Sequence, residues 1–137
     1  MRTIHDFDEL VDLVQRSRDL FIRYSHGPAV DACGRSRDYE ADVDLPGWSV
    51  TTLHPEPWWP RPVADWVARR VCKYSELADA DPERRPWVLG GRVVGNGPDH
   101  EPLVVDVEPI GWLAPDVIDE AKRHYHERFE VGRDSTG

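Results

Sequence analysis

Three titratable residues, Asp99, His100 and Glu101, stand together at the end of the glycine-rich turn at residues 95–99. Residues at the point where a loop becomes a strand often carry function. An aspartate, a histidine and a glutamate there could serve as acid and base groups, so a hydrolase is one hypothesis. Neighbouring strand residues point to opposite faces, however, so His100 and Glu101 could cooperate only from an irregular loop. The sequence has no GxSxG, HExxH or Walker A motif to support this hypothesis.

A second feature of chemical interest is a single arginine inside an apolar stretch. Arg23 lies in LFIRYS, residues 20–25. A buried guanidinium needs a partner or a ligand. Because the chain has 26 aspartates and glutamates, we favour an ion pair or a side chain that reaches solvent. His26, Asp31 and Cys33 are of metal-ligand types, but their spacing is not characteristic and no metal site is predicted.

Two adjacent tryptophans, Trp58 and Trp59, lie in a segment that four prolines hold extended, residues 54–62. On such a rigid rim they could stack on a planar ligand or anchor a partner protein. The alternative is that they cap a small core, since an indole combines a large apolar area with one hydrogen-bond donor.

Composition and charge limit the class of protein. The 137 residues fit one domain, and six tryptophans among 39% hydrophobic residues are enough for a core. A net charge of −9 disfavours binding to nucleic acid or to anionic membranes. Cys33 and Cys72 form no CxxC motif, so we expect two free thiols. No apolar run is long enough to span a bilayer and no signal peptide is present, so we expect a cytoplasmic protein.

The elements that must position these residues follow from periodicity and from turn residues. In chain order we predict a helix over 6–16, strands over 20–25 and 48–53, a helix from Pro62 to near Leu77, a hairpin over 87–107, a strand segment over 109–113 and a helix from Pro115. Residues 30–47 are predicted to form a long surface loop and residues 130–137 a disordered tail. The hairpin implies antiparallel pairing, so we predict a single α+β domain over 1–129, with helices packed on a mainly antiparallel sheet.

The alternation within these elements also predicts core and turn residues. The glycines at 90, 91, 95 and 97 indicate positive φ, a bulge or a close approach of another group. The side chains that we expect to be nearly buried are Ile22, Val50, Trp66, Val71, Leu89, Val105 and Ile118.

Six stretches of the sequence carry a family resemblance: FIRYSHGP, LPGWSV, EPWW, WVARR, RPWVL and GPDHEPLVV. Through them nearly the whole chain resembles a family of small uncharacterised actinobacterial proteins, classed as a domain of unknown function. This resemblance implies no activity.

The chain also resembles ADP-ribosyltransferases in the order of Arg23, Ser49 with Thr51, and Glu101. The resemblance implies NAD as cofactor: the arginine would hold the pyrophosphate, and Ser49 and Thr51 would orient the catalytic Glu101. Tyr24, Trp48 or Trp58 would stack on the nicotinamide ring. The chain departs from the family pattern, because Ser49-Val50-Thr51 replaces Ser-Thr-Ser and there is no Glu-x-Glu.

Two function classes therefore remain open beside the hydrolase. One is a possible NAD-binding, ADP-ribosyltransferase-like protein with catalytic Glu101, Ser49 and Thr51, and cofactor-binding Arg23, Tyr24 and Trp48. The other is a non-enzymatic interaction module, such as an inhibitor, an antitoxin or a regulatory subunit, that binds a protein partner through Trp58 and Trp59.

Overall fold

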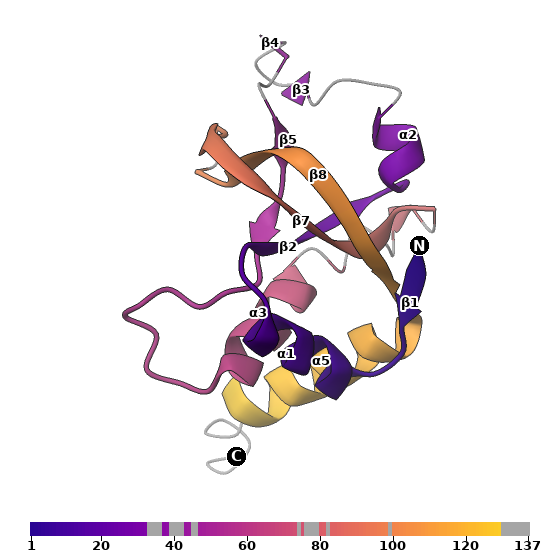
Figure 1. Cartoon of the computed structure of the whole chain (residues 1–137). Helices are drawn as coiled ribbons and strands as arrows, with labels where there is room; N and C mark the ends of the chain where they lie inside the picture. The colour runs from indigo at the N-terminus through magenta and orange to yellow at the C-terminus, as the bar shows by residue number, and fades with distance from the viewer. Residues whose placement is uncertain are drawn as a thin grey trace.

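The computed structural model describes residues 1–32, 37–38, 43–44, 47–73, 75, 80–81, 83–98 and 100–129. The α+β fold predicted from the sequence is confirmed: a six-stranded, mostly antiparallel sheet carries helices (Figure 1). The described helices are α1 (Phe7–Arg16), α2 (Pro28–Ala32), α3 (Val63–Lys73) and α5 (Pro115–Phe129). The described strands are β1 (Arg2–Ile4), β2 (Leu20–Ser25), β3 (Arg37–Asp38), β4 (Val43–Asp44), β5 (Trp48–Ser49), β6 (Thr51–Thr52), β7 (Arg85–Asn96) and β8 (Pro102–Leu113).

The β7–β8 hairpin is the centre of the sheet. The strands run in the order β1-β8-β7-β2-β6, and β5 adds a further pairing to β8. Among the described strands of this sheet, only β1 and β8 pair in parallel. Strands β3 and β4 pair with each other in a separate two-stranded sheet.

The hairpin is longer than the predicted range of 87–107. The segment 109–113, which we predicted as a separate strand, continues β8. A register shift between Val88 and Leu89 lets the ladder continue past Pro109, which has no N–H to donate. Two further shifts, near Gly91 and before Gly95, are bulges, which is one of the three alternatives that the glycines indicated. Among the described glycines, positive φ occurs only at Gly27.

The main core lies between the sheet and three helices. Figure 1 shows α1, α3 and α5 on one side of the sheet and α2 on the other. Helix α1 begins at an N-cap where the Asp6 carboxylate accepts the Glu9 N–H at 2.7 Å. Its buried residues Phe7, Leu10 and Val14 recur at helical spacing and join the core beneath the sheet.

The opposite face of the sheet holds a second, smaller cluster of buried side chains. Its members are Phe21, Val50, Trp87, Leu89 and Val104, with Trp48, Val107 and Trp112 packed against them. Because neighbouring residues of β2 alternate between faces, Ile22 faces the main core while Phe21 and Arg23 face this second cluster.

Most of the predicted core is confirmed. Five of the expected side chains are buried: Ile22, Val50, Trp66, Val71 and Leu89. The predictions for Val105 and Ile118 are wrong, because both are only partly buried. The bulges in β7 shift the pairing so that Val104 is the buried valine, and the orientation of α5 places Val117 in the core instead of Ile118.

Other predicted boundaries changed as well. The strand expected over 48–53 is two short strands, because β5 pairs with β8 and β6 pairs with β2. Residues 28–32 form helix α2, so the predicted loop over 30–47 is helical at its start, and much of the rest lies outside the described residues. Leu77, the expected end of α3, and the tail 130–137 also lie outside them. None of the helices in the described residues is long and apolar enough to cross a membrane.

Candidate functional site

The guanidinium of Arg23 is held by partners from two segments. Its Nε donates to the Asp31 carboxylate at 2.8 Å, and Nη1 donates to the Ser49 carbonyl at 2.6 Å. The Arg23 side chain is 20% exposed and that of Asp31 11%. The expectation of an ion pair with an acid is thus confirmed. A ligand phosphate at Arg23 would have to share the guanidinium with Asp31.

Asp31 belongs to a hydrogen-bond network that is satisfied within the fold. The hydroxyl of Ser25 donates to Asp31 at 2.5 Å and accepts the Trp87 indole N–H at 2.9 Å. It also accepts the Gly27 N–H at 3.2 Å. Gly27 has φ 107 and a Cβ there would lie 2.7 Å from the Trp112 ring, so the turn after β2 requires glycine. This network holds α2 against β2 and explains why a charged pair is tolerated there.

Ser49 and Glu101 also come together. The Ser49 hydroxyl donates to the Glu101 carboxylate at 3.1 Å. A Cβ at Gly97 would collide with this carboxylate, so the glycine-rich turn leaves the space that Glu101 occupies. His100 is exposed, with φ 63, in an irregular turn outside the strand, and Asp99 lies outside the described residues.

The other predicted site residues lie on both faces of the sheet. Trp48 lies beneath the Arg23 guanidinium, 5.6 Å from its carbon to the ring centroid. Because side chains alternate along a strand, the Ser49 hydroxyl points away from Trp48, and Arg23 reaches only the main chain of Ser49. Thr51 is opposite Ile22 in the register, so it faces the helices. Tyr24 faces them too, and its hydroxyl donates to the Val71 carbonyl at 2.6 Å.

The tryptophan pair lies elsewhere, beside α3 and α5, and its two members differ. Trp59 packs edge-on against the buried Trp66, with ring centroids 5.0 Å apart, and its indole N–H donates to the Pro62 carbonyl at 3.3 Å. Trp58 is 69% exposed although its ring lies 6.1 Å from that of Trp59. One tryptophan therefore caps the core, and the other faces solvent.

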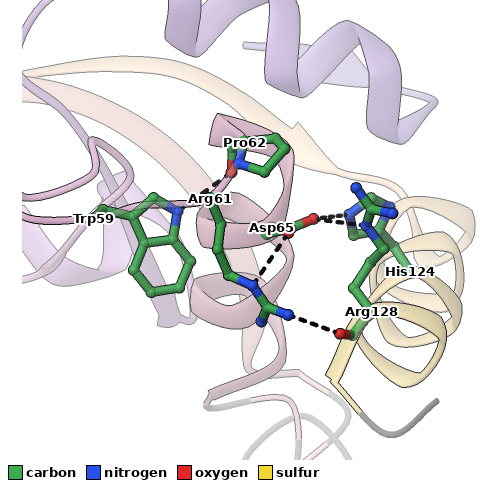
Figure 2. Close-up of polar contacts among 6 residues, drawn as sticks. All are labelled: Trp59, Arg61, Pro62, Asp65, His124 and Arg128. Atoms are coloured by element: carbon green, nitrogen blue, oxygen red, sulfur yellow. Dashed lines mark hydrogen bonds and ion pairs between the residues drawn. The ribbon is translucent and has the colours of Figure 1, made fainter. Parts of the chain in front are cut away.

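Beside these rings, Asp65 of α3 is a buried carboxylate, 2% exposed, among basic side chains of α5 (Figure 2). His124 Nε2 lies 2.7 Å from its Oδ1, and Arg128 Nε 3.3 Å from the same atom. Arg61 lies 3.8 Å from Oδ2 and donates to the Arg128 carbonyl at 3.1 Å. Figure 2 shows Asp65 bridging the two helices. A buried charge with several charge-assisted partners fixes the orientation of the helices that carry it.

Comparison with known proteins gives a match to a family model. The model of a family of unknown function, DUF6098, covers residues 1–136. The chain belongs to DUF6098. No curated protein and no solved structure matches it.

A groove of about 470 Å³ opens on this DUF6098 chain where β2, β6 and the hairpin meet. Its lining includes Phe21, His54, Glu56 and Val93. The Nε2 atom of His54 is buried and has no hydrogen-bond partner among the described residues. Burial lowers the pKa of His54, and the negative charge of Asp19 offsets part of that shift. Since Glu56 also begins the turn that carries Trp58, the groove and the exposed indole lie on one continuous segment.

Sequence reasoning missed several of these arrangements. Nothing in the sequence marks Asp31 as the partner of Arg23, because this contact depends on the fold of α2 over β2. The contact of His124 with Asp65 joins residues 59 positions apart, so no local pattern in the sequence predicts it. The sequence groups His26 with Asp31 and Cys33 as metal-ligand types, whereas the structure brings His26 to Asp81 and Glu83, and Cys33 lies outside the described residues.

Proposed function

We propose that this DUF6098 chain is a protein-binding module whose anchor is the Trp58 indole. The observation that carries the proposal is the 69% exposure of this tryptophan. Leaving so large an apolar side chain in water forgoes the free energy that its burial would release, about 25 cal/mol per Å² of apolar surface. Tryptophan is also among the residues that most often dominate protein–protein binding energies.

The support beneath Trp58 favours this role. The backbone N–H of Trp59 donates to the Glu56 carbonyl at 2.9 Å, and this hydrogen bond closes a turn that contains Trp58. The Trp58 ring also contacts Trp66 edge-on, at 6.2 Å between centroids. An anchor that is held in place before binding loses little conformational entropy when a partner covers it.

The chemistry of the partner follows from size and charge. An indole requires an apolar pocket, and its N–H requires an acceptor at the pocket's edge. The net charge of −9 favours a partner with a basic surface around that pocket, because long-range attraction then accelerates association. The binding module proposed here is thus specific for a basic protein with an indole-sized pocket.

The test is to compare partner binding of wild type with that of two variants. Proteins crosslinked through a photoreactive phenylalanine at the exposed position 57, which leaves Trp58 in place, are identified, purified and titrated. Trp58→Ala is expected to weaken binding by 30-fold or more, which corresponds to about 2 kcal/mol. The matched control, Val30→Ala, removes an apolar side chain that is 56% exposed on α2 and is expected to bind as wild type does. Equal affinity for wild type and Trp58→Ala would exclude the anchor.

A second candidate function, an NAD-binding ADP-ribosyltransferase-like activity, is favoured by one observation. The Ser49 hydroxyl donates to Glu101, which is the role that the family resemblance implies for this serine. In this proposal Glu101 stabilises the positive charge that develops as nicotinamide departs, and Arg23 holds the pyrophosphate. Two observations weigh against it. The contact between Arg23 and Asp31 already largely neutralises the guanidinium. The Ser49 hydroxyl that meets Glu101 points away from Trp48, over which the Arg23 guanidinium lies, so Arg23 and Glu101 do not face one common site.

The second proposal is tested by NAD binding and by turnover. NAD at a hundred times its dissociation constant is expected to stabilise the fold by about 2.7 kcal/mol. Glu101→Gln is expected to abolish turnover and keep binding, whereas Arg23→Ala is expected to weaken binding. The absence of a thermal shift at millimolar NAD would leave the binding module as the proposed function.

A further inference from the structure

We infer that His26, Asp81 and Glu83 form a binding site for a divalent transition-metal ion, with Zn²⁺ as the reference ion. One ligand atom of each residue lies within 4.8 Å of the other two. The three residues come from two separate segments, the end of β2 and the residues that precede β7. The site shares no residue with the Trp58 anchor or with the Ser49–Glu101 pair, so a test of metal binding is independent of both proposed functions.

The separation of the first two ligand atoms suits a metal ion. His26 Nε2 lies 3.0 Å from Asp81 Oδ2. Zinc binds histidine nitrogen and carboxylate oxygen at about 2.0–2.2 Å, which places neighbouring ligand atoms about 3.0–3.4 Å apart for angles between 90° and tetrahedral. An ion can therefore replace the shared proton between these two atoms, and the imidazole then offers its Nε2 lone pair. Glu83 offers the third ligand atom, within 4.8 Å of the other two.

The backbone places the two acids together. The Asp81 carboxylate accepts the Glu83 N–H at 3.1 Å through Oδ1, which leaves Oδ2 for His26. The Asp81 carbonyl accepts the Arg84 N–H at 2.9 Å and closes the turn. The next residue, Arg85, pairs with Ser25, so the antiparallel ladder of β2 and β7 brings this turn to His26.

The types of ligand narrow the choice of metal. One imidazole nitrogen with two carboxylate oxygens suits zinc, cobalt or manganese, whereas calcium and magnesium favour oxygen ligands alone. Two carboxylates balance the charge of a divalent ion. The side chains of His26 and Asp81 are 37% and 44% exposed, so water can complete the coordination. The bound ion would tie the start of β7 to the end of β2.

The test measures metal binding by the full-length protein after EDTA treatment, in a Cys33→Ser background that removes a competing thiol. Calorimetry with Zn²⁺ is expected to show one ion per chain, and Co²⁺ is expected to give visible absorption bands. His26→Ala and Glu83→Gln are each expected to weaken Zn²⁺ binding at least tenfold. Glu83→Gln keeps the backbone N–H that Asp81 accepts, so it separates loss of a ligand from loss of the turn.

The matched control is His100→Asn, at an exposed histidine outside the cluster with φ 63, a conformation that asparagine tolerates. Its Zn²⁺ affinity is expected to equal that of the parent protein. Two results would overturn the inference: no heat of binding with 1 mM Zn²⁺, or unchanged affinity in both His26→Ala and Glu83→Gln. Circular dichroism of each variant establishes that it is folded. If His26→Ala is unfolded, His26→Gln replaces it.

Discussion

At the scale of single residues, the Cys72 thiol is the group whose chemistry the fold changes most clearly. Burial raises its pKa to about 11 from an ordinary 9.0, and the charge of Lys122 offsets part of that shift. Because the thiolate is the reactive form, a two-unit rise lowers its population about 100-fold at neutral pH. We expect iodoacetamide to label Cys72 about 100-fold more slowly in native Cys33→Ser protein than in the same protein in urea, measured by mass spectrometry. Equal rates would contradict the shift. Cys72 is free, as predicted, while Cys33 lies outside the described residues.

His54 gives a pH dependence at the same scale. Its pKa is lowered in the fold by burial, from an ordinary value of 6.5. Below pH 6.5 the unfolded chain therefore binds a proton that the folded chain does not, and the free energy of unfolding falls as the pH falls. We expect urea titrations at pH 7.5 and 5.5 to show this loss in wild type, and a smaller loss in His54→Gln. The same loss in both proteins would assign it to other groups.

At the scale of elements, Ile118, one of the two core predictions that failed, serves as a control for Leu89. Leu89 is fully buried in β7, so Leu89→Ala is expected to lower the free energy of unfolding by about 2–5 kcal/mol. Ile118 is only partly buried on α5, so Ile118→Ala is expected to cost less than Leu89→Ala. Denaturant titration of both variants checks the order. An equal or larger loss for Ile118→Ala would contradict the burial of these two side chains.

The elements also show which features of the fold the sequence predicts and which it does not. Local periodicity predicted α1, β2 and the start of α5 closely, because each buries one regular face. It missed the exact buried residue in β8, because bulges near Gly91 and Gly95 change the alternation through pairing with another strand. At the candidate site, the order of residues along the chain led us to expect Ser49 beside Glu101, and their side chains are in contact. The Asp31 partner of Arg23 depends on α2, which the loop composition did not reveal.

Asp65 joins helix α3 to helix α5, and the contribution of this buried carboxylate to stability can be compared with that of an exposed carboxylate. Asp65→Asn removes the charge from a carboxylate that accepts bonds from His124 and Arg128, so a loss of about 1–3 kcal/mol is expected. Asp12→Asn is the control, since Asp12 forms an exposed ion pair with Arg16 and its loss is expected to cost about 0.5 kcal/mol or less. Urea unfolding measures both. If the two variants lose the same stability, Asp65 does not fix the helices.

At the scale of the whole molecule, charge and an open sheet edge act against each other. Strand β7 pairs with β2 only up to Gly90. In its outer half, residues 91–96, no described strand pairs with the edge that faces away from β8. Val93 and Val94 in that half are 50% and 42% exposed. Such an edge can template pairing with another copy unless charge keeps the copies apart. The net charge of −9 supplies that repulsion at pH 7, and it vanishes near the sequence pI of about 5.0.

We therefore expect self-association as the pH approaches 5.0, detected as a rise in apparent mass by static light scattering. Val94→Lys is expected to reduce it, because a lysine on the outer half of β7 opposes edge-to-edge pairing. Val30→Lys is the matched control: it adds the same charge at an equally apolar, exposed position on α2, far along the chain from the hairpin. If both lysines suppress association equally, net charge alone governs it. If Val94→Lys acts much more strongly, the copies meet through the outer half of β7.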